Sequence, residues 1–224
     1  MARTGFFHHV GTFLLFAATV LLIVTCISAP VVNNLAILRV SLGGDNSEGS
    51  QINFGTFGYC LTIPDARDEC TSPRVGYSPT AYLDDADVAA FSESAEDTMR
   101  ILTRTMILHP IACGINFFAF LLALGAGAIG SFFASLVALA AFLATGLACV
   151  LDFVLFSILR RKANETSVVD ARYGPAAWTT LASAICSLLG AIIVFFTCCS
   201  ARLHRRRDTV TKDEYAPPRR RWLW

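Results

Sequence analysis

The side chains of this sequence that could do chemistry are eight cysteines, four histidines and one carboxylate, Asp152, which directly follows a long uncharged stretch. No Gly-x-Ser-x-Gly, His-Glu-x-x-His, P-loop or Cys-x-x-Cys motif occurs in the sequence. The histidines are too few and too scattered to suggest a metal site by their spacing. The residues therefore predict no enzyme, no catalytic residue, no cofactor and no metal.

The cysteines fall into three groups with different expected chemistry. Cys60 and Cys70 are the only two in the long polar segment, and an even pair in an oxidising compartment predicts a disulfide. A zinc site is the alternative, but no histidine of that segment lies near them in the sequence. Cys198 and Cys199 directly precede a basic run, so they are candidates for reversible palmitoylation, or simply two small residues at a helix end. The other four lie in apolar segments, where small packing residues are expected: Cys26, Cys113, Cys149 and Cys186.

The elements that must position these side chains are long apolar segments. The composition is 54% hydrophobic and 16% charged, with a mean hydropathy of +0.56, whereas globular domains carry about 25% charge. The 47 residues 105–151 contain no Asp, Glu, Lys or Arg. As helix they would span about 70 Å, enough for two bilayer crossings. We predict transmembrane spans at 10–31, 106–125, 132–158 and 176–198. For the first, a cleaved signal peptide is the alternative, although the apolar stretch is longer than usual for one.

Charge segregation predicts the orientation of these spans. Residues 39–104 contain 11 acids and 5 bases, whereas the chain from Arg202 onward contains 8 bases and 3 acids. Positive charge clusters on the cytoplasmic side of a membrane, so we expect both termini in the cytoplasm. The segments between the spans are then a cytoplasmic N-terminus 1–9, an extracellular loop 32–105, a cytoplasmic turn 126–131, a second extracellular loop 159–175 and a basic cytoplasmic tail 199–224.

Two features of the second extracellular loop bear on this orientation. Arg160, Arg161 and Lys162 oppose it, because they place positive charge on the outer side. The sequon Asn164-Glu165-Thr166 supports it, with Asn164 as a candidate glycosylation site. Because the basic cluster at the C-terminal end is larger, we keep the prediction that both termini are cytoplasmic.

Two titratable residues are expected to lie at a similar depth in the membrane. His109 lies near the external start of the second span and Asp152 near the external end of the third. These spans are joined by a short Gly-rich turn and must be antiparallel, so the two residues are a candidate intramembrane pair. Alkaline pH would deprotonate the histidine and weaken such a pair. The alternative is that Asp152 pairs with Arg160 and that His109 caps the helix start before Pro110.

The long loop combines strand-like and helix-like patterns. Residues 36–41 and 51–63 are rich in β-branched and aromatic residues, which predicts a small antiparallel sheet. Gly55 and Gly58 in the second segment indicate a bulge or a close backbone approach. Apolar residues at roughly helical spacing over 83–102 predict an amphipathic helix leading into the second span. The predicted fold is therefore a membrane all-α bundle of four transmembrane helices with a small disulfide-pinned extracellular β-subdomain.

The same loop carries a recognisable motif on this four-span frame. It consists of Asn53-Phe-Gly-Thr-Phe-Gly-Tyr-Cys60, then Cys70, then Pro73-Arg-Val-Gly-Tyr77. The motif resembles the fungal PalI family, which includes the pH-response regulator PalI and related eisosomal tetraspans. The overall plan also looks like that of claudins, which have a loop sheet pinned by one disulfide. By the resemblance to the PalI family, the signature positions are Gly55, Phe57, Gly58, Tyr59, Cys60, Cys70, Gly76 and Tyr77.

The resemblance implies a plasma-membrane tetraspan that assists ambient alkaline-pH signalling, beside a separate multi-span membrane sensor. The eisosomal relatives imply the alternative, a structural organiser of membrane domains that self-associates. The basic tail is expected to bind anionic lipids of the inner leaflet. Neither nucleic acid nor a small-molecule substrate is expected as a partner. A transporter or channel is the weakest interpretation, because only Asp152 is available as a charged residue to line a pore.

Overall fold

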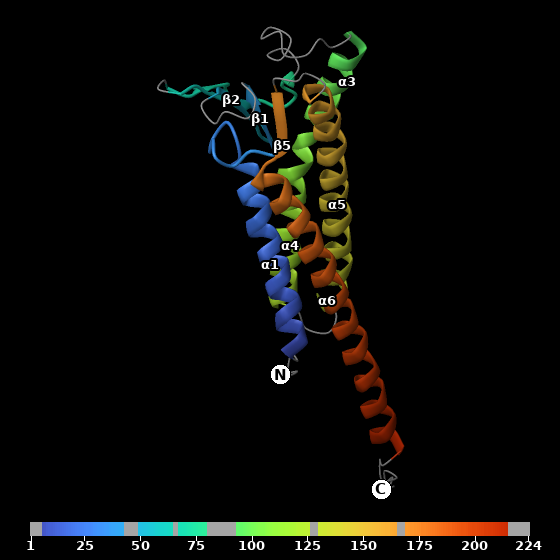
Figure 1. Ribbon diagram of the computed structural model, residues 1–224. Coiled ribbons are helices and arrows are strands. Elements are labelled where there is room, and N and C mark those ends of the chain that lie inside the picture. The colour runs from blue at the N-terminus through green and yellow to red at the C-terminus, as the bar shows by residue number, and fades with distance from the viewer. Residues whose placement is uncertain are drawn as a thin grey trace, which may run out of the picture.

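The computed structural model shows a four-helix bundle with a five-stranded antiparallel sheet at one end (Figure 1). It describes residues 6–42, 49–64, 67–79, 93–125, 130–164 and 169–214. The long helices are α1 (Phe6–Cys26), α4 (Leu108–Gly125), α5 (Gly130–Ala163) and α6 (Pro175–Glu214). Four helical stretches in these described ranges are long and apolar enough to cross a membrane. The predicted fold class, a four-span bundle with a small β-subdomain, is therefore confirmed.

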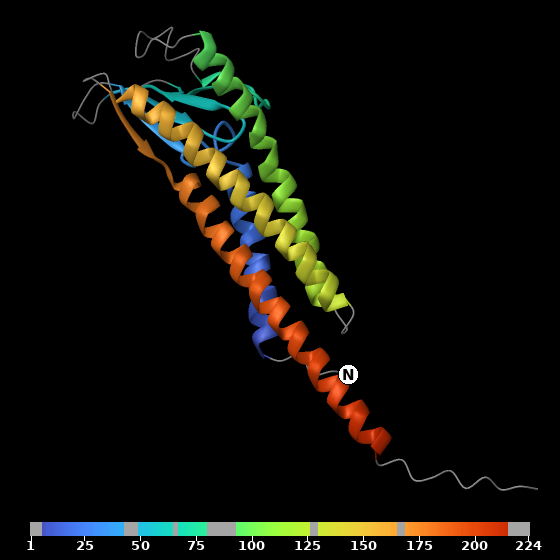
Figure 2. The same cartoon turned by 90° about the vertical axis from the view of Figure 1, so that its right-hand side faces the viewer.

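Two of the long helices are longer than a bilayer crossing requires. α5 has 34 residues and is about 50 Å long, whereas the hydrocarbon core is about 30 Å thick. The turns of α5 that follow Asp152 rise beside the sheet (Figure 2). The sequence predicted a loop from residue 159, but the helix continues to Ala163. α6 likewise continues as helix to Glu214, through the basic residues where a tail was predicted from residue 199.

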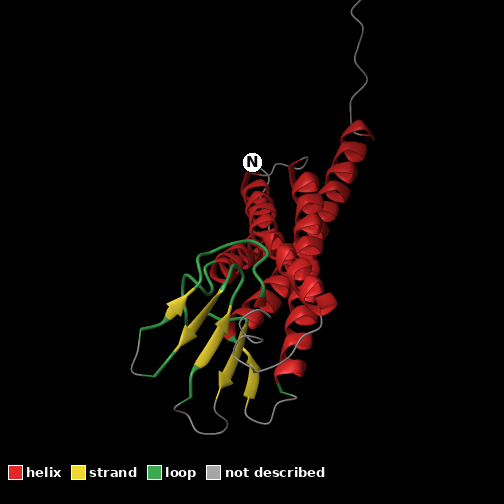
Figure 3. Cartoon of the chain, turned by 90° about the horizontal axis from the view of Figure 1, so that it is seen from above, coloured by secondary structure: helices red, strands yellow, loops and turns green. Residues whose placement is uncertain are grey.

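The sheet has the order β4-β3-β2-β1-β5, and every neighbouring pair is antiparallel. Viewed from above, it extends to one side of the bundle (Figure 3). The predicted segment 51–63 is two strands, because the chain turns at 55–58 and returns. β5 was not predicted; it comes from the short connection between α5 and α6 and pairs with β1 along its whole length. The strands are β1 (Leu38–Leu42), β2 (Gln51–Phe54), β3 (Tyr59–Thr62), β4 (Glu69–Cys70) and β5 (Val169–Tyr173).

The edge strand β5 is bonded to side chains from the end of α5. The Ala171 amide donates to Asn164 Oδ1 at 2.7 Å, and Arg160 Nε donates to the Ala171 carbonyl at 3.0 Å. The Arg160 guanidinium also lies 5.4 Å from the centroid of the Tyr173 ring, which is a cation–π distance. Arg160, which opposed the predicted orientation, therefore has a structural role.

One apolar core joins the sheet to the helices. Leu155, Phe156 and Leu159 of α5 pack in it against Leu38, Val40, Ile52 and Phe54 of the sheet. Helix α3 (Glu93–Arg104) and the 3-10 turn η1 (Thr105–Ile107) add Met99 and Met106. The predicted amphipathic helix 83–102 is described only from residue 93 onward, and residues 80–92 lie outside the described part of the chain.

Gly55 and Gly58 lie where two stretches of chain meet. A Cβ at Gly55 would lie 2.1 Å from the carbonyl oxygen of Ala29, and one at Gly58 would lie 3.1 Å from the Pro30 ring. Phe57, in the same turn, accepts a 2.9 Å hydrogen bond from the backbone after β4. Because Ala29 and Pro30 follow α1, the β2–β3 turn rests directly on the chain that leaves the bundle. The close backbone approach expected from the sequence is present.

We expect Gly55→Ala to destabilise the protein by about 3 kcal/mol, in the upper part of the usual range for overpacking. The added methyl group meets the Ala29 backbone, which cannot move aside as a flexible side chain could. Thermal unfolding of the purified protein in detergent measures the effect. Gly114→Ala is the control, because its Cβ meets nothing within 4 Å and alanine in a helix gains about 0.5–1 kcal/mol over glycine. Equal unfolding temperatures for the two variants would contradict this prediction.

Candidate functional site at the junction of sheet and bundle

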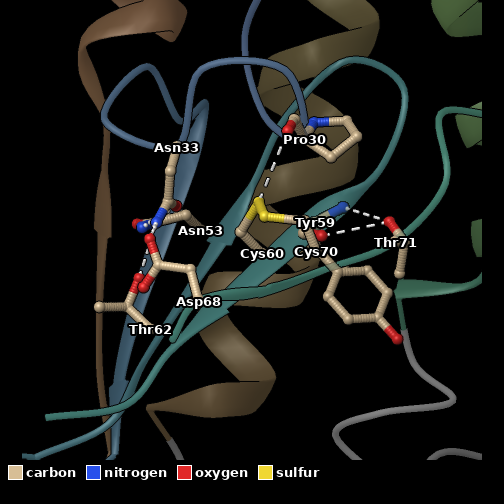
Figure 4. Close-up of a disulfide and its surroundings, with 9 residues drawn as sticks. All are labelled: Pro30, Asn33, Asn53, Tyr59, Cys60, Thr62, Asp68, Cys70 and Thr71. Carbon is tan, nitrogen blue, oxygen red and sulfur yellow. Dashed lines mark hydrogen bonds between the residues drawn. A yellow bond between two sulfur atoms is a disulfide. The ribbon is translucent and has the colours of Figure 1, made fainter. Parts of the chain in front are cut away.

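The predicted disulfide is present and ties β3 to β4. Cys60 and Cys70 occupy directly opposed positions of the two strands (Figure 4). The Tyr59 amide donates to Thr71 Oγ1 at 3.1 Å, and the Thr71 amide donates to the Tyr59 carbonyl at 3.0 Å. β4 has only two residues, so these bonds and the disulfide hold it in place. A crosslink over such a short loop contributes about 3 kcal/mol in the chain-entropy model.

Asn33 fastens the chain after α1 to three parts of the sheet. Its Nδ2 donates to Thr62 Oγ1 at 2.8 Å and also to a carboxylate oxygen of Asp68 (Figure 4). Its Oδ1 accepts a hydrogen bond from Asn53 Nδ2 at 2.7 Å. No pattern in the sequence indicated this cluster, because its four members come from separate segments with no characteristic spacing.

The last two signature positions connect the sheet to α3. Gly76 has a φ of +75°, and a Cβ there would lie 2.5 Å from Arg104 Cγ. Glycine adopts this conformation without the strain that a side chain would add. Tyr77 is buried, and its hydroxyl donates to the Gly55 carbonyl at 2.8 Å. Thr103 of α3 donates to the Tyr77 carbonyl at 2.7 Å. Tyr77 therefore bonds to the sheet through its hydroxyl and to α3 through its backbone.

The structure brings together His109 and Asp152, the candidate pair. His109 Nε2 lies 2.9 Å from Asp152 Oδ2, and their side chains are only 1% and 3% exposed. His109 Nδ1 lies 3.2 Å from the Met106 carbonyl oxygen. An ionised carboxylate and a carbonyl can only accept hydrogen bonds, so a proton on each ring nitrogen is needed to satisfy both. The geometry thus fits a charged imidazolium that lies opposite a carboxylate.

The contacts around this pair distinguish between the two partners predicted for Asp152, His109 and Arg160. The Asp152 carboxylate is near enough to Tyr77 to add to the raised pKa of that phenol, whose main cause is burial. Arg160, its predicted alternative partner, instead bonds to the Ala171 carbonyl on β5. The pair therefore lies at the junction between the bundle and the signature residues of the sheet.

Two further polar contacts lie deeper in the bundle. Asn116 Nδ2 donates to Thr145 Oγ1 at 3.0 Å, and Ser187 Oγ donates to Asn116 Oδ1 at 2.9 Å. This network joins α4, α5 and α6. At the end of the bundle away from the sheet, His8 Nε2 donates to the Ala123 carbonyl at 3.0 Å. The sequence did not single out His8, because nothing in the pattern indicates which carbonyl of another helix faces it.

The remaining predicted sites lie away from the junction. Asn164 is exposed and bonds to β5, while the other sequon residues, 165 and 166, lie outside the described residues. Cys198 is buried and Cys199 is exposed. The end of the tail, 215–224, also lies outside the described residues, so its predicted lipid contact stays a prediction. Among the described residues, no group of three His, Cys, Asp or Glu side chains could hold a metal ion.

The helices, sheet and disulfide define a class of protein: multi-pass membrane proteins with four spans and a disulfide-pinned β-subdomain, on a claudin-like plan. The model of the SUR7/PalI family matches residues 7–190. The chain therefore belongs to the SUR7/PalI family, and the resemblance seen in its loop motif is confirmed.

Two curated relatives share about half of this chain. The pH-response regulator protein palI/prr-5 of Neurospora crassa is 28% identical over 111 residues, which are 50% of this chain and 14% of the relative. The pH-response regulator protein palI/RIM9 of Emericella nidulans is 30% identical over 115 residues, which are 51% of this chain and 18% of the relative. The similarity therefore covers less than a fifth of either relative.

The Tyr77 hydroxyl gives the junction a pH dependence that can be measured. Burial raises the pKa of Tyr77 above its ordinary value of 10.0, and the nearby Asp152 carboxylate adds to the shift. A raised pKa means that the stability contributed by the neutral hydroxyl is complete below pH 10 and declines as the pH rises further.

We expect Tyr77→Phe to cost about 1 kcal/mol near pH 8, because one buried hydrogen bond is lost. The difference from wild type should shrink as the pH rises above about 10, because only wild type then has a buried phenol to ionise on unfolding. Unfolding free energies of both proteins in detergent between pH 8 and pH 11 measure this. A difference that stays constant across that range would contradict the assignment.

Proposed function

We propose that this protein is a plasma-membrane accessory of ambient alkaline-pH signalling, which assists or positions a multi-span sensor. In this proposal both termini are cytoplasmic and the sheet faces the outside. The observation that carries the proposal is the His109–Asp152 pair, buried where the sheet meets the bundle. Membership of the SUR7/PalI family and the names of the two relatives, both pH-response regulators, support it.

Loss of one proton would change the hydrogen bonding of the pair. Charged His109 donates from both ring nitrogens, to Met106 and to Asp152. Neutral imidazole has one N–H, so one of these two acceptors loses its donor when alkaline medium removes the proton. A buried acceptor without a partner costs about 1–3 kcal/mol, and more when it is charged. Alkaline pH therefore weakens the contact that holds α4 to α5 or to η1.

The contacts around η1 offer a route from this change to the sheet. Met106 belongs to η1, which directly follows α3. Thr103 of α3 donates to the Tyr77 carbonyl, and the Tyr77 hydroxyl donates to Gly55 in the β2–β3 turn. A shift of η1 would therefore move the sheet relative to the bundle. The proposed sensor partner responds to the position of the sheet.

The test of this mechanism is a variant that keeps a polar side chain but cannot titrate. We expect His109→Gln to blunt an alkaline-response reporter severalfold in cells that lack the native gene. His8→Gln is the matched control, since His8 is also a buried histidine but lies at the opposite end of the bundle. It should leave the response intact. The amounts of both variants at the cell surface are measured in parallel. An unchanged response with His109→Gln at a normal surface amount would contradict the mechanism.

The role of the sheet is tested separately with Cys60→Ser in the same strain. We expect wild type to restore the alkaline response and Cys60→Ser to fail, because β4 loses its crosslink to β3. Cys186→Ser is the control, since Cys186 is a free cysteine within α6. If the strain without the gene responds normally, the signalling proposal is wrong. A role as a membrane-domain organiser is then the next candidate, examined through lateral distribution at the cell surface.

A further inference from the structure

A groove that faces the membrane runs between α5 and α6, in the half of the bundle away from the sheet. Its volume is about 270 Å³, and its lining is Ser135, Leu136, Leu139, Leu188, Ala191, Ile192, Phe195 and Phe196. The α6 positions of the lining lie about 20–30 Å along the helix from its start next to the sheet. The groove therefore opens to the leaflet on the side opposite the sheet, and its lining suits an apolar chain.

Cys199 lies on the face of α6 that lines this groove. Leu188, Ile192, Phe195 and Cys199 follow at intervals of four, three and four residues, the spacing of a single helix face. Cys199 is thus one turn, about 6 Å, beyond Phe195. It is exposed and free of any disulfide, whereas Cys198 is only 3% exposed and faces the bundle. Of the two adjacent thiols, only that of Cys199 is exposed, and it lies one helical turn beyond the lining residue Phe195.

The sequence beyond Cys199 places this thiol at the level of the membrane surface. The helix continues through a basic run that includes Arg202 and Arg206. Clustered arginines at the end of a span mark the polar boundary of the bilayer. Cysteines at this boundary are accessible to acyl transfer. From Cys199 the groove leads directly toward the bilayer core.

We propose that Cys199 is S-acylated and that its acyl chain lies in the groove between α5 and α6. The donor is a long-chain acyl-CoA. The Cys199 thiolate attacks the thioester carbonyl carbon, a new carbon–sulfur bond forms, and the bond to coenzyme A breaks. Coenzyme A leaves as a thiol with the proton that Cys199 lost, so no oxidant or reductant is involved. The inference is independent of pH signalling and requires only that the basic end of α6 faces the cytoplasm.

Metabolic labelling of the full-length protein with an alkyne analogue of palmitate tests the site. We expect hydroxylamine-sensitive label on wild type and on Cys198→Ser, and label at the background of cells without the protein on Cys199→Ser. Equal labelling of Cys199→Ser and wild type would overturn the proposal. Loss of label from Cys198→Ser alone would overturn it as well, because the buried cysteine would then be the modified one.

A palmitate analogue that also carries a diazirine tests where the chain lies. After irradiation we expect crosslinks to α5 peptides that contain Leu136 and Leu139. Leu139→Trp should keep the thioester label but lose these crosslinks, because the indole fills the groove. Leu143→Trp is the control, since Leu143 is also exposed on α5 but does not line the groove. Wild-type crosslinks only to bulk lipid or to a second copy of this chain would overturn the placement.

Discussion

The contact on which the structure depends is between two backbones, that of Gly55 in the β2–β3 turn and that of Ala29 after the first span. A Cβ on Gly55 would not fit between them, so the two main chains meet directly at this point, beside the apolar core that joins the sheet to the helices. Other contacts reinforce this one. Tyr77 bonds to the carbonyl of the same glycine, and Asn33 bonds to β2, β3 and the segment before β4. These contacts together fasten the β2–β3 turn to the chain that leaves the first span.

Stability alone does not account for the buried His109–Asp152 pair beneath this contact. A buried ion pair contributes little net stability, and apolar residues of similar volume often replace it without loss. With Asp152 ionised, only the charged form of His109 donates to both of its acceptors. Such an arrangement makes the local structure depend on one proton, which an apolar core cannot do.

The sequence predicted the features that follow from hydropathy and composition. Four spans, the Cys60–Cys70 pair and the meeting of His109 with Asp152 all follow from where residues sit along helices or compartments. β5 escaped prediction because it is short and carries two charges, and its partner β1 lies more than a hundred residues earlier. The Asn33 cluster escaped because side chains from four segments meet only after the sheet has formed. Long-range pairing of short polar segments leaves no local periodicity to detect.

The bonds of Ala171 have a consequence for assembly. An edge strand normally offers free amides and carbonyls to a strand from another molecule. Here the amide and the carbonyl at the centre of β5 are already used by Asn164 and Arg160 of the same chain. A strand from a neighbouring molecule could pair with the centre of β5 only by displacing these two bonds. Association through the centre of this edge therefore favours contacts between side chains or with lipids over the addition of a strand.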